Sequence, residues 1–121
     1  MKRLLLAACL GLISPAYALT NPVGDWLVAD HSARVAITPC GSNLCGSISW
    51  SADGGDVGQA ILLQMKPDGP RWTGTVVDVR NGKRYLAHIH LQSNEQLRLD
   101  GCVLGGIICS GEVWTRTKLA E

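Results

Sequence analysis

Four of the five cysteines fall into two close pairs, Cys40/Cys45 and Cys102/Cys109, a spacing that suits either metal binding or disulfide formation. Neither pair has the C-x-x-C spacing of a redox enzyme or a zinc knuckle, and no histidine lies near either pair in sequence. In an exported protein such cysteines oxidise, so we expect two disulfides. Geometry favours the local pairing, because each pair flanks turn residues. Chain entropy favours a long-range pairing, and that alternative stays open.

The histidines offer a second possible chemistry, metal coordination. His88 and His90 project from the same face of a strand, as two metal ligands would, and His31 is the third histidine. Their neighbours Tyr85 and Ile89 belong to the opposite, apolar face, so we expect both histidines to face water and to bind no metal.

Carboxylates are the third candidate chemistry, because a pair of them can act as general acid and base. The aspartates are spread along the chain without a recognisable pairing, and the sequence contains no G-x-S-x-G, H-E-x-x-H or phosphate-binding loop. We therefore expect neither catalytic residues nor a cofactor, and predict that the protein is not an enzyme.

The N-terminus has the three parts of a secretory signal peptide. Lys2 and Arg3 precede an apolar stretch, residues 4–13, and Ala16 and Ala18 form a small-x-small cleavage site. We expect cleavage after Ala18, export to the periplasm, and a single domain over residues 19–121. A lipoprotein cut before Cys9 is the alternative, but it would leave a very short apolar stretch. No later segment approaches the ~20 apolar residues of a transmembrane helix.

Charge excludes one class of partner. The chain has 11 basic and 10 acidic residues, and its arginines and lysines are scattered singly. A nucleic-acid-binding protein would be expected to carry a basic stripe, so we expect no nucleic-acid partner.

The elements that must position these residues are short strands with alternating apolar residues and intervening turns, typical of an all-β domain. We expect strands over residues 25–29, 33–38, 44–50, 59–66, 71–79, 83–91, 96–102 and 110–117, with the longest loop over residues 51–58. Asn81-Gly82 predicts a type I′ hairpin turn, in which both central residues need a positive φ. Eight antiparallel strands with short connections favour a closed up-and-down barrel, and a β-sandwich is the alternative.

A barrel of this size either is filled by side chains or holds one small ligand. On the expected inner face lie the candidates for a ligand-binding wall: Trp26, Ile48, Trp50, Leu63, Met65, Tyr85, Ile89 and Leu97. Four tryptophans in a chain without phenylalanine could line such a cavity or could fill the core. Trp114 and Arg116 share a face, so Arg116 is placed to stack on a tryptophan as a structural lock.

An ordered set of residues along the chain also carries a family resemblance. Gly24-Asp25-Trp26 in the first strand and Trp114-Thr115-Arg116 in the last resemble the calycin arrangement, which implies that Trp26 packs beneath an arginine from the C-terminal end. Together with Pro39-Cys40-Gly41, Leu44-Cys45-Gly46, Asn81-Gly82-Lys83 and the pair Cys102 and Cys109, they resemble the bacterial exported family called domain of unknown function 2147. The chain departs from that family between Ser51 and Gln59, where the family carries a longer insert. The resemblance implies fold and location, and the family has no assigned activity.

The segment between the second pair of cysteines is unusual for a turn because it is wholly apolar. It contains Val103, Leu104, Ile107 and Ile108. An apolar turn either folds inward as a plug over one barrel end or forms an exposed contact surface for a partner, membrane or ligand. We expect the plug.

Two functional hypotheses follow. The first is a periplasmic barrel that binds a small apolar or lipid-like molecule within the barrel or at its mouth. The second is a protein-interaction module, such as an inhibitor of an envelope hydrolase, and it rests on the loose similarity of Asn81-Gly82-Lys83-Arg84-Tyr85 to the G-x-x-Y turn of periplasmic lysozyme inhibitors.

Overall fold

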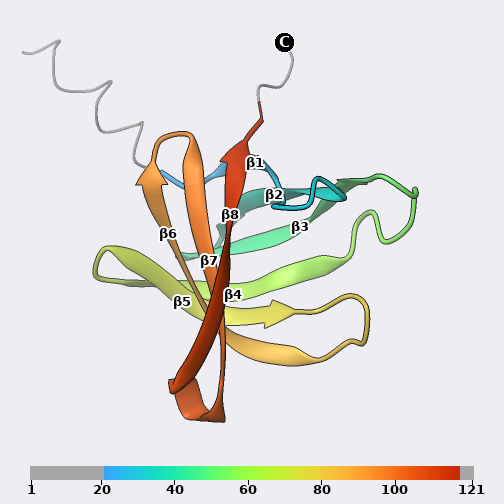
Figure 1. The fold of residues 1–121 in the computed structure, drawn as a ribbon. Coiled ribbons are helices and arrows are strands. Elements are labelled where there is room, and N and C mark those ends of the chain that lie inside the picture. Colours follow the sequence, from blue (N-terminus) through green and yellow to red (C-terminus); the bar gives the residue numbers. More distant parts are fainter. Residues whose placement is uncertain (1–20, 118–121) are drawn as a thin grey trace, which may run out of the picture.

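Alternating apolar and polar residues form eight consecutive strands in the computed structural model, which describes residues 21–117 (Figure 1). The strands are β1 (Gly24–Leu27), β2 (Ala33–Cys40), β3 (Asn43–Ser51), β4 (Ala60–Asp68), β5 (Arg71–Val77), β6 (Arg84–Ser93), β7 (Gln96–Val103) and β8 (Ile108–Arg116), with a 3-10 turn η1 (Leu104–Gly106) between the last two. The predicted signal peptide, residues 1–18, and the lipidation alternative at Cys9 lie outside the described residues. No helix within residues 21–117 is long and apolar enough to cross a membrane.

Each strand pairs antiparallel with the next, and β1 pairs with β8, so the sheet closes into a barrel. Each strand thus has a neighbouring strand on both sides, which confirms the predicted up-and-down barrel over the sandwich. The closing ladder is short, because only Trp26 and Leu27 of β1 pair with β8, whereas β7 and β8 pair along eight positions.

In such a barrel alternate connections lie at opposite ends. The β1–β2, β3–β4, β5–β6 and β7–β8 connections share the end that we call the open end. The β2–β3, β4–β5 and β6–β7 connections share the other, which we call the closed end. The described chain begins and ends at the closed end, and Figure 1 shows both of its ends on the side opposite the β7–β8 connection.

The closed end is filled by apolar side chains. Trp26, Met65, Ile89 and Leu97 are completely buried there, and the indole nitrogen of Trp26 donates a hydrogen bond of 2.9 Å to the carbonyl of Pro22. The rest of the buried cluster comes from β2, β3, β4, β6 and β8: Val35, Ile37, Leu44, Ile48, Ile61, Leu62, Ala87 and Trp114. No polar or charged residue among those described is buried. These apolar side chains therefore form one packed core inside the barrel.

Two irregularities change the predicted facing of side chains. The register of β4 shifts between Leu63 and Lys66, where Gln64 has a φ of 46°, and Leu62 is completely buried while Leu63 is only partly buried. The register of β2 and β3 shifts at Arg34/Val35, and Trp50 is exposed. The prediction that Leu63 and Trp50 line the interior is therefore wrong, because a bulge moves the following residues to the other face of the sheet.

The β5–β6 connection also differs from its prediction. Asp78 to Lys83 form a six-residue loop, closed by a 2.8 Å hydrogen bond from the Asp78 amide to the Lys83 carbonyl. Among its residues Gly82 has a positive φ, of 74°, and Asn81 does not. A type I′ turn needs both, so this is not the predicted two-residue turn.

Both cysteine pairs form local disulfides. Cys40 bonds to Cys45 across the β2–β3 turn at the closed end, with Cα atoms 5.8 Å apart. Cys102 bonds to Cys109, its direct partner in the β7–β8 ladder at the open end. Each disulfide thus joins strands that the sheet already pairs.

Candidate ligand-binding site

A cavity of about 620 Å³ lies at the open end of the barrel. Residues from the inner face of the sheet form its floor: Val35, Ile48, Ile61, Val76, Leu99 and Trp114. They face inward because they alternate with outward residues, and four of them, Val35, Ile48, Ile61 and Trp114, also belong to the buried core cluster. The floor is apolar and the opening faces solvent.

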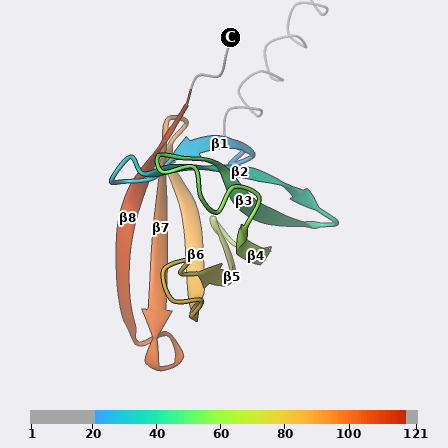
Figure 2. The ribbon, with the colours of Figure 1, turned by 90° about the vertical axis from the view of Figure 1, so that its right-hand side faces the viewer.

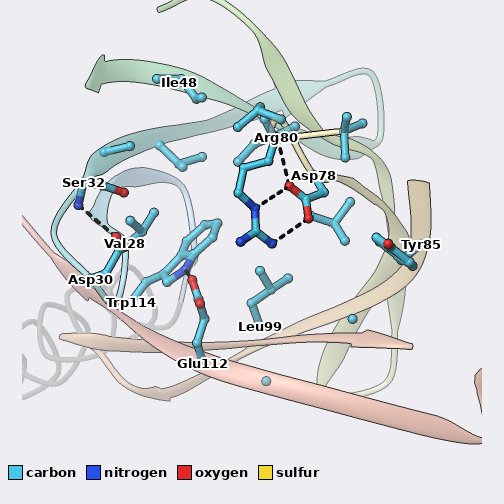
Figure 3. A pocket seen from close by; sticks show the side chains of 18 of the residues that line it. Val28, Asp30, Ser32, Ile48, Asp78, Arg80, Tyr85, Leu99, Glu112 and Trp114 are labelled. Carbon is cyan, nitrogen blue, oxygen red and sulfur yellow. Dashed lines mark hydrogen bonds and ion pairs between the residues drawn. The ribbon is translucent and has the colours of Figure 1, made fainter. Parts of the chain in front are cut away.

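Polar residues surround the mouth of this cavity. Asp30 and Ser32 come from the β1–β2 connection, Asp78 and Arg80 from the β5–β6 connection, and Glu112 from β8. Figure 3 shows the Arg80 side chain held by Asp78, and the Arg80 side chain is 85% exposed to solvent at the mouth. An apolar floor with a few polar groups at the rim is the usual composition of a small-molecule site.

Asp78 fixes the position of Arg80. The carboxylate accepts hydrogen bonds from Arg80 Nε at 3.0 Å, from Nη2 at 2.8 Å and from the Arg80 amide at 2.9 Å. The hydrogen bonds from the Arg80 side chain, followed by that from its backbone, lower the pKa of Asp78 from its usual 3.8 to about 2. The pair therefore stays charged at every physiological pH.

Two other carboxylates at the rim are also held in place. The indole nitrogen of Trp114 donates a hydrogen bond of 2.6 Å to Glu112 Oε2, which ties a floor residue to the rim. Hydrogen bonds from the Ser32 side chain and backbone lower the pKa of Asp30. The rim thus presents both signs of charge in fixed positions.

The structure divides the predicted ligand-binding residues into three groups. Ile48 and Tyr85 line the cavity. Trp26, Met65, Ile89 and Leu97 face inward but belong to the packed core at the closed end. Trp50 and Leu63 do not face the interior. Alternation indicates which residues point inward but carries no information on their height along the barrel axis, so it missed Val35, Ile61, Val76 and Leu99.

Charged rim residues were also missed. Asp78 and Arg80 precede the Asn81-Gly82 turn. Opposite charges two residues apart beside a turn weakly indicate an ion pair within the loop. Glu112 lies on β8 opposite Leu99 and lines the cavity.

The predicted structural lock is present at the closed end. The guanidinium of Arg116 lies 4.4 Å from the ring centroid of Trp26 and donates hydrogen bonds to the carbonyls of Asn94, Val23 and Asn21, at 2.7, 3.0 and 3.0 Å. It also passes over Gly24, where a Cβ would lie 2.6 Å from Arg116 Nη1. Trp114 does not join this stack, because it packs in the core and lines the cavity.

The histidines lie on the outside of the barrel. His88 Nδ1 is 2.8 Å from the hydroxyl of Thr73, which itself donates to Asp68 at 2.7 Å. Within the part of the chain that the structure describes, no three His, Cys, Asp or Glu residues lie close enough to hold a metal ion.

The apolar segment between Cys102 and Cys109 does not plug the barrel, which corrects the expectation above. Val103 is 42% exposed, Ile108 54% and Ile107 81%. The side chain of Leu104 lies outside the description. Figure 1 shows the β7–β8 connection projecting beyond the rest of the barrel.

Comparison with known proteins agrees with this architecture. The family model described as "Uncharacterized protein conserved in bacteria (DUF2147)" matches residues 24–116. No curated protein matches the sequence. Among solved structures the chain is similar to one described as "Protein HP1028 from the human pathogen Helicobacter pylori belongs to the lipocalin family". The TM-score is 0.71 and the identity 15%, over 82% of this chain and 84% of that chain. At this identity the similarity shows the fold, and it confirms the calycin-like prediction at that level.

Proposed function

The chain belongs to this uncharacterised bacterial family, and we propose that it binds a small apolar or amphipathic molecule in the cavity at the open end of the barrel. The observation that carries the proposal is the cavity itself, about 620 Å³ with an apolar floor and a polar rim. Small-molecule sites are typically ~300–1,000 Å³ and have this composition.

The position of the polar groups indicates how such a molecule would lie. Its apolar part would contact Ile48, Leu99 and Trp114, where burial of apolar surface contributes roughly 25 cal/mol per Å². Its polar part would lie at the mouth near Arg80 and Tyr85. Arg80 is already positioned by Asp78, so a ligand would not have to order it.

Gly101 offers a direct test, because it lines the cavity and has no special backbone conformation. A Cβ there would meet only Val76 Cγ1, at 3.8 Å, an ordinary contact. Gly101→Ala, Gly101→Leu and Gly101→Phe should therefore fill the cavity progressively. We expect the affinity for N-phenyl-1-naphthylamine, a neutral apolar fluorescent probe, to fall in that order and to be lost in Gly101→Phe.

The alanine variant is the matched control, because it changes the same residue but leaves the cavity open. Thermal unfolding would verify that all three variants fold. Equal probe affinity in the wild type and in a folded Gly101→Phe would rule out the cavity as the binding site. A protein partner for the exposed β5–β6 turn would then be the alternative.

We propose further that the protein is exported and cleaved after Ala18, leaving a single domain over residues 19–121. Two disulfides are consistent with an oxidising compartment such as the periplasm. The intact mass of the protein isolated from its own cells would test this. A chain that keeps residues 1–18, or one with four free thiols at residues 40, 45, 102 and 109, would contradict it.

A further inference from the structure

The exposed large apolar side chains gather at one end of the barrel. Among the described residues they are Trp50, Val57, Val79, Leu86, Val103, Ile107 and Ile108. Each lies in one of the β3–β4, β5–β6 and β7–β8 connections or in the strand residues next to it. These connections belong to the open end, and none of the exposed large apolar residues described lies at the closed end. Isolated exposed apolar residues are ordinary, but three of these seven, Val103, Ile107 and Ile108, lie together in and beside the β7–β8 connection.

The β7–β8 tip, Val103 to Ile108, is the most prominent of these connections. The Cys102–Cys109 disulfide closes its base, and Gly105 and Gly106 turn the chain with φ values of 68° and 96°. Gly106 packs near Leu86, since a Cβ there would lie 3.3 Å from Leu86 Cδ2. The tip is thus a short covalently closed wedge that exposes aliphatic side chains, and Figures 1 and 2 both show it as the farthest projection on its side.

The inner surface of the barrel continues onto this tip. Along the β7–β8 ladder the inward pairs are Leu99 with Glu112, Gly101 with Ser110 and Val103 with Ile108. The first two pairs and Val103 line the cavity. An apolar chain leaving the cavity along this ladder would therefore pass from Leu99 to Val103 and Ile108.

We propose that the β7–β8 tip docks the barrel onto a lipid bilayer, so that an amphiphile passes between the bilayer and the cavity. The docking step stands on the exposed side chains, and the transfer step rests on the function proposed above. The occupant is a lipid phase because the apolar wall of the cavity continues along the β7–β8 ladder onto the tip, so an apolar chain held in the cavity would reach the surface that Val103 and Ile108 expose. The two ends of the described chain lie at the closed end, away from the tip.

Vesicle co-sedimentation tests the docking step. The probes are vesicles of phosphatidylcholine alone and of phosphatidylcholine mixed with phosphatidylglycerol. Ile107 is 81% exposed and does not line the cavity, so Ile107→Asp should leave folding and N-phenyl-1-naphthylamine binding unchanged. We expect it to weaken vesicle binding roughly tenfold to a hundredfold. Gln92→Asp, which adds the same charge at an exposed position of β6 near the closed end, should bind vesicles like the wild type.

The outcomes separate the two proposals. Wild-type binding to neither vesicle, or equal binding by Ile107→Asp, overturns docking whatever the probe result. A wild type that binds vesicles but does not bind the probe overturns the cavity function and the transfer step, whereas the docking proposal stands. Self-association of the wild type that Ile107→Asp abolishes, without vesicle binding, would make the occupant a second copy of this chain.

Discussion

Arg116 and Arg34 both stack on tryptophans, but their surroundings differ, so we expect the two stacks to contribute differently to the stability of the fold. Arg116 covers the completely buried Trp26 and donates to three backbone carbonyls from two separate segments. Arg34 covers the exposed Trp50, and its buried Nε has no hydrogen-bond partner. The first stack connects both ends of the described chain with the β6–β7 turn. The second leaves a buried polar atom unsatisfied, which costs free energy.

At the residue scale we therefore predict that Arg116→Ala destabilises the protein by about 2–4 kcal/mol, because it removes a desolvated cation–π contact and charge-assisted hydrogen bonds. Arg34→Met, the matched control, should cost less than about 1 kcal/mol, because it retains the apolar stem over Trp50 and removes the unpaired donor. Urea unfolding at pH 7 would measure both free energies. Similar losses for the two variants would contradict the assignment of Arg116 as the structural lock.

The irregular segment of β4 determines how closely β4 and β5 approach. At Gly74 a Cβ would lie 2.6 Å from the carbonyl oxygen of Gln64 and 2.7 Å from that of Leu63, and both are backbone atoms. These atoms belong to the bulge where Gln64 has a positive φ. A glycine is required at this position because of the close approach, since its φ does not require one.

At the element scale, Gly74→Ala should lower the free energy of unfolding by about 1–3 kcal/mol, because β5 must move away from the bulge. The matched control is Gly101→Ala on β7, where the added Cβ meets only Val76 at 3.8 Å. That variant should be neutral or more stable by up to about 1 kcal/mol, since it reduces the freedom of the unfolded chain. Equal effects at both glycines in urea unfolding would show that β4 relaxes around the added methyl group.

This bulge and the one between β2 and β3 explain much of what the sequence could not predict. Alternation of apolar residues placed all eight strands in the correct order, and the turn chemistry around Cys40 and Cys102 placed both disulfides. A bulge shifts facing by one residue without a distinctive residue type, so Leu62 and Leu63 were exchanged and Trp50 was placed inside. The sequence predicted binding within the barrel or at its mouth without distinguishing the two, because the division between packed core and open mouth depends on strand stagger and tilt.

At the scale of the whole molecule, the two ends of the barrel differ in composition. The closed end holds the buried core, the Arg116 stack and the chain ends. The open end holds the cavity and the exposed apolar residues. A chain this small buries only ~65% of the surface of its unfolded state, so its core alone gives a modest stability. Each end carries one disulfide.

The two disulfides should therefore contribute independently to stability. They close loops of 5 and 7 residues in sequence separation, which in the chain-entropy model is worth about 2 kcal/mol each. They lie at opposite ends and share no partner, so their effects should add. We expect Cys40→Ser/Cys45→Ser and Cys102→Ser/Cys109→Ser each to lose about 2 kcal/mol in urea unfolding. The quadruple variant should lose about 4 kcal/mol, much of the ~5–15 kcal/mol typical of a small domain. A reducing agent should leave the quadruple variant unchanged, which controls for effects of the reagent.

The two ends should also differ in function. Loss of Cys102–Cys109 frees the base of the β7–β8 tip and should weaken vesicle binding, whereas loss of Cys40–Cys45 should not. A quadruple variant whose loss in free energy of unfolding clearly exceeds the sum of the losses of the two double variants would mean that the two ends of the barrel are coupled through the sheet. The two ends would then not act independently.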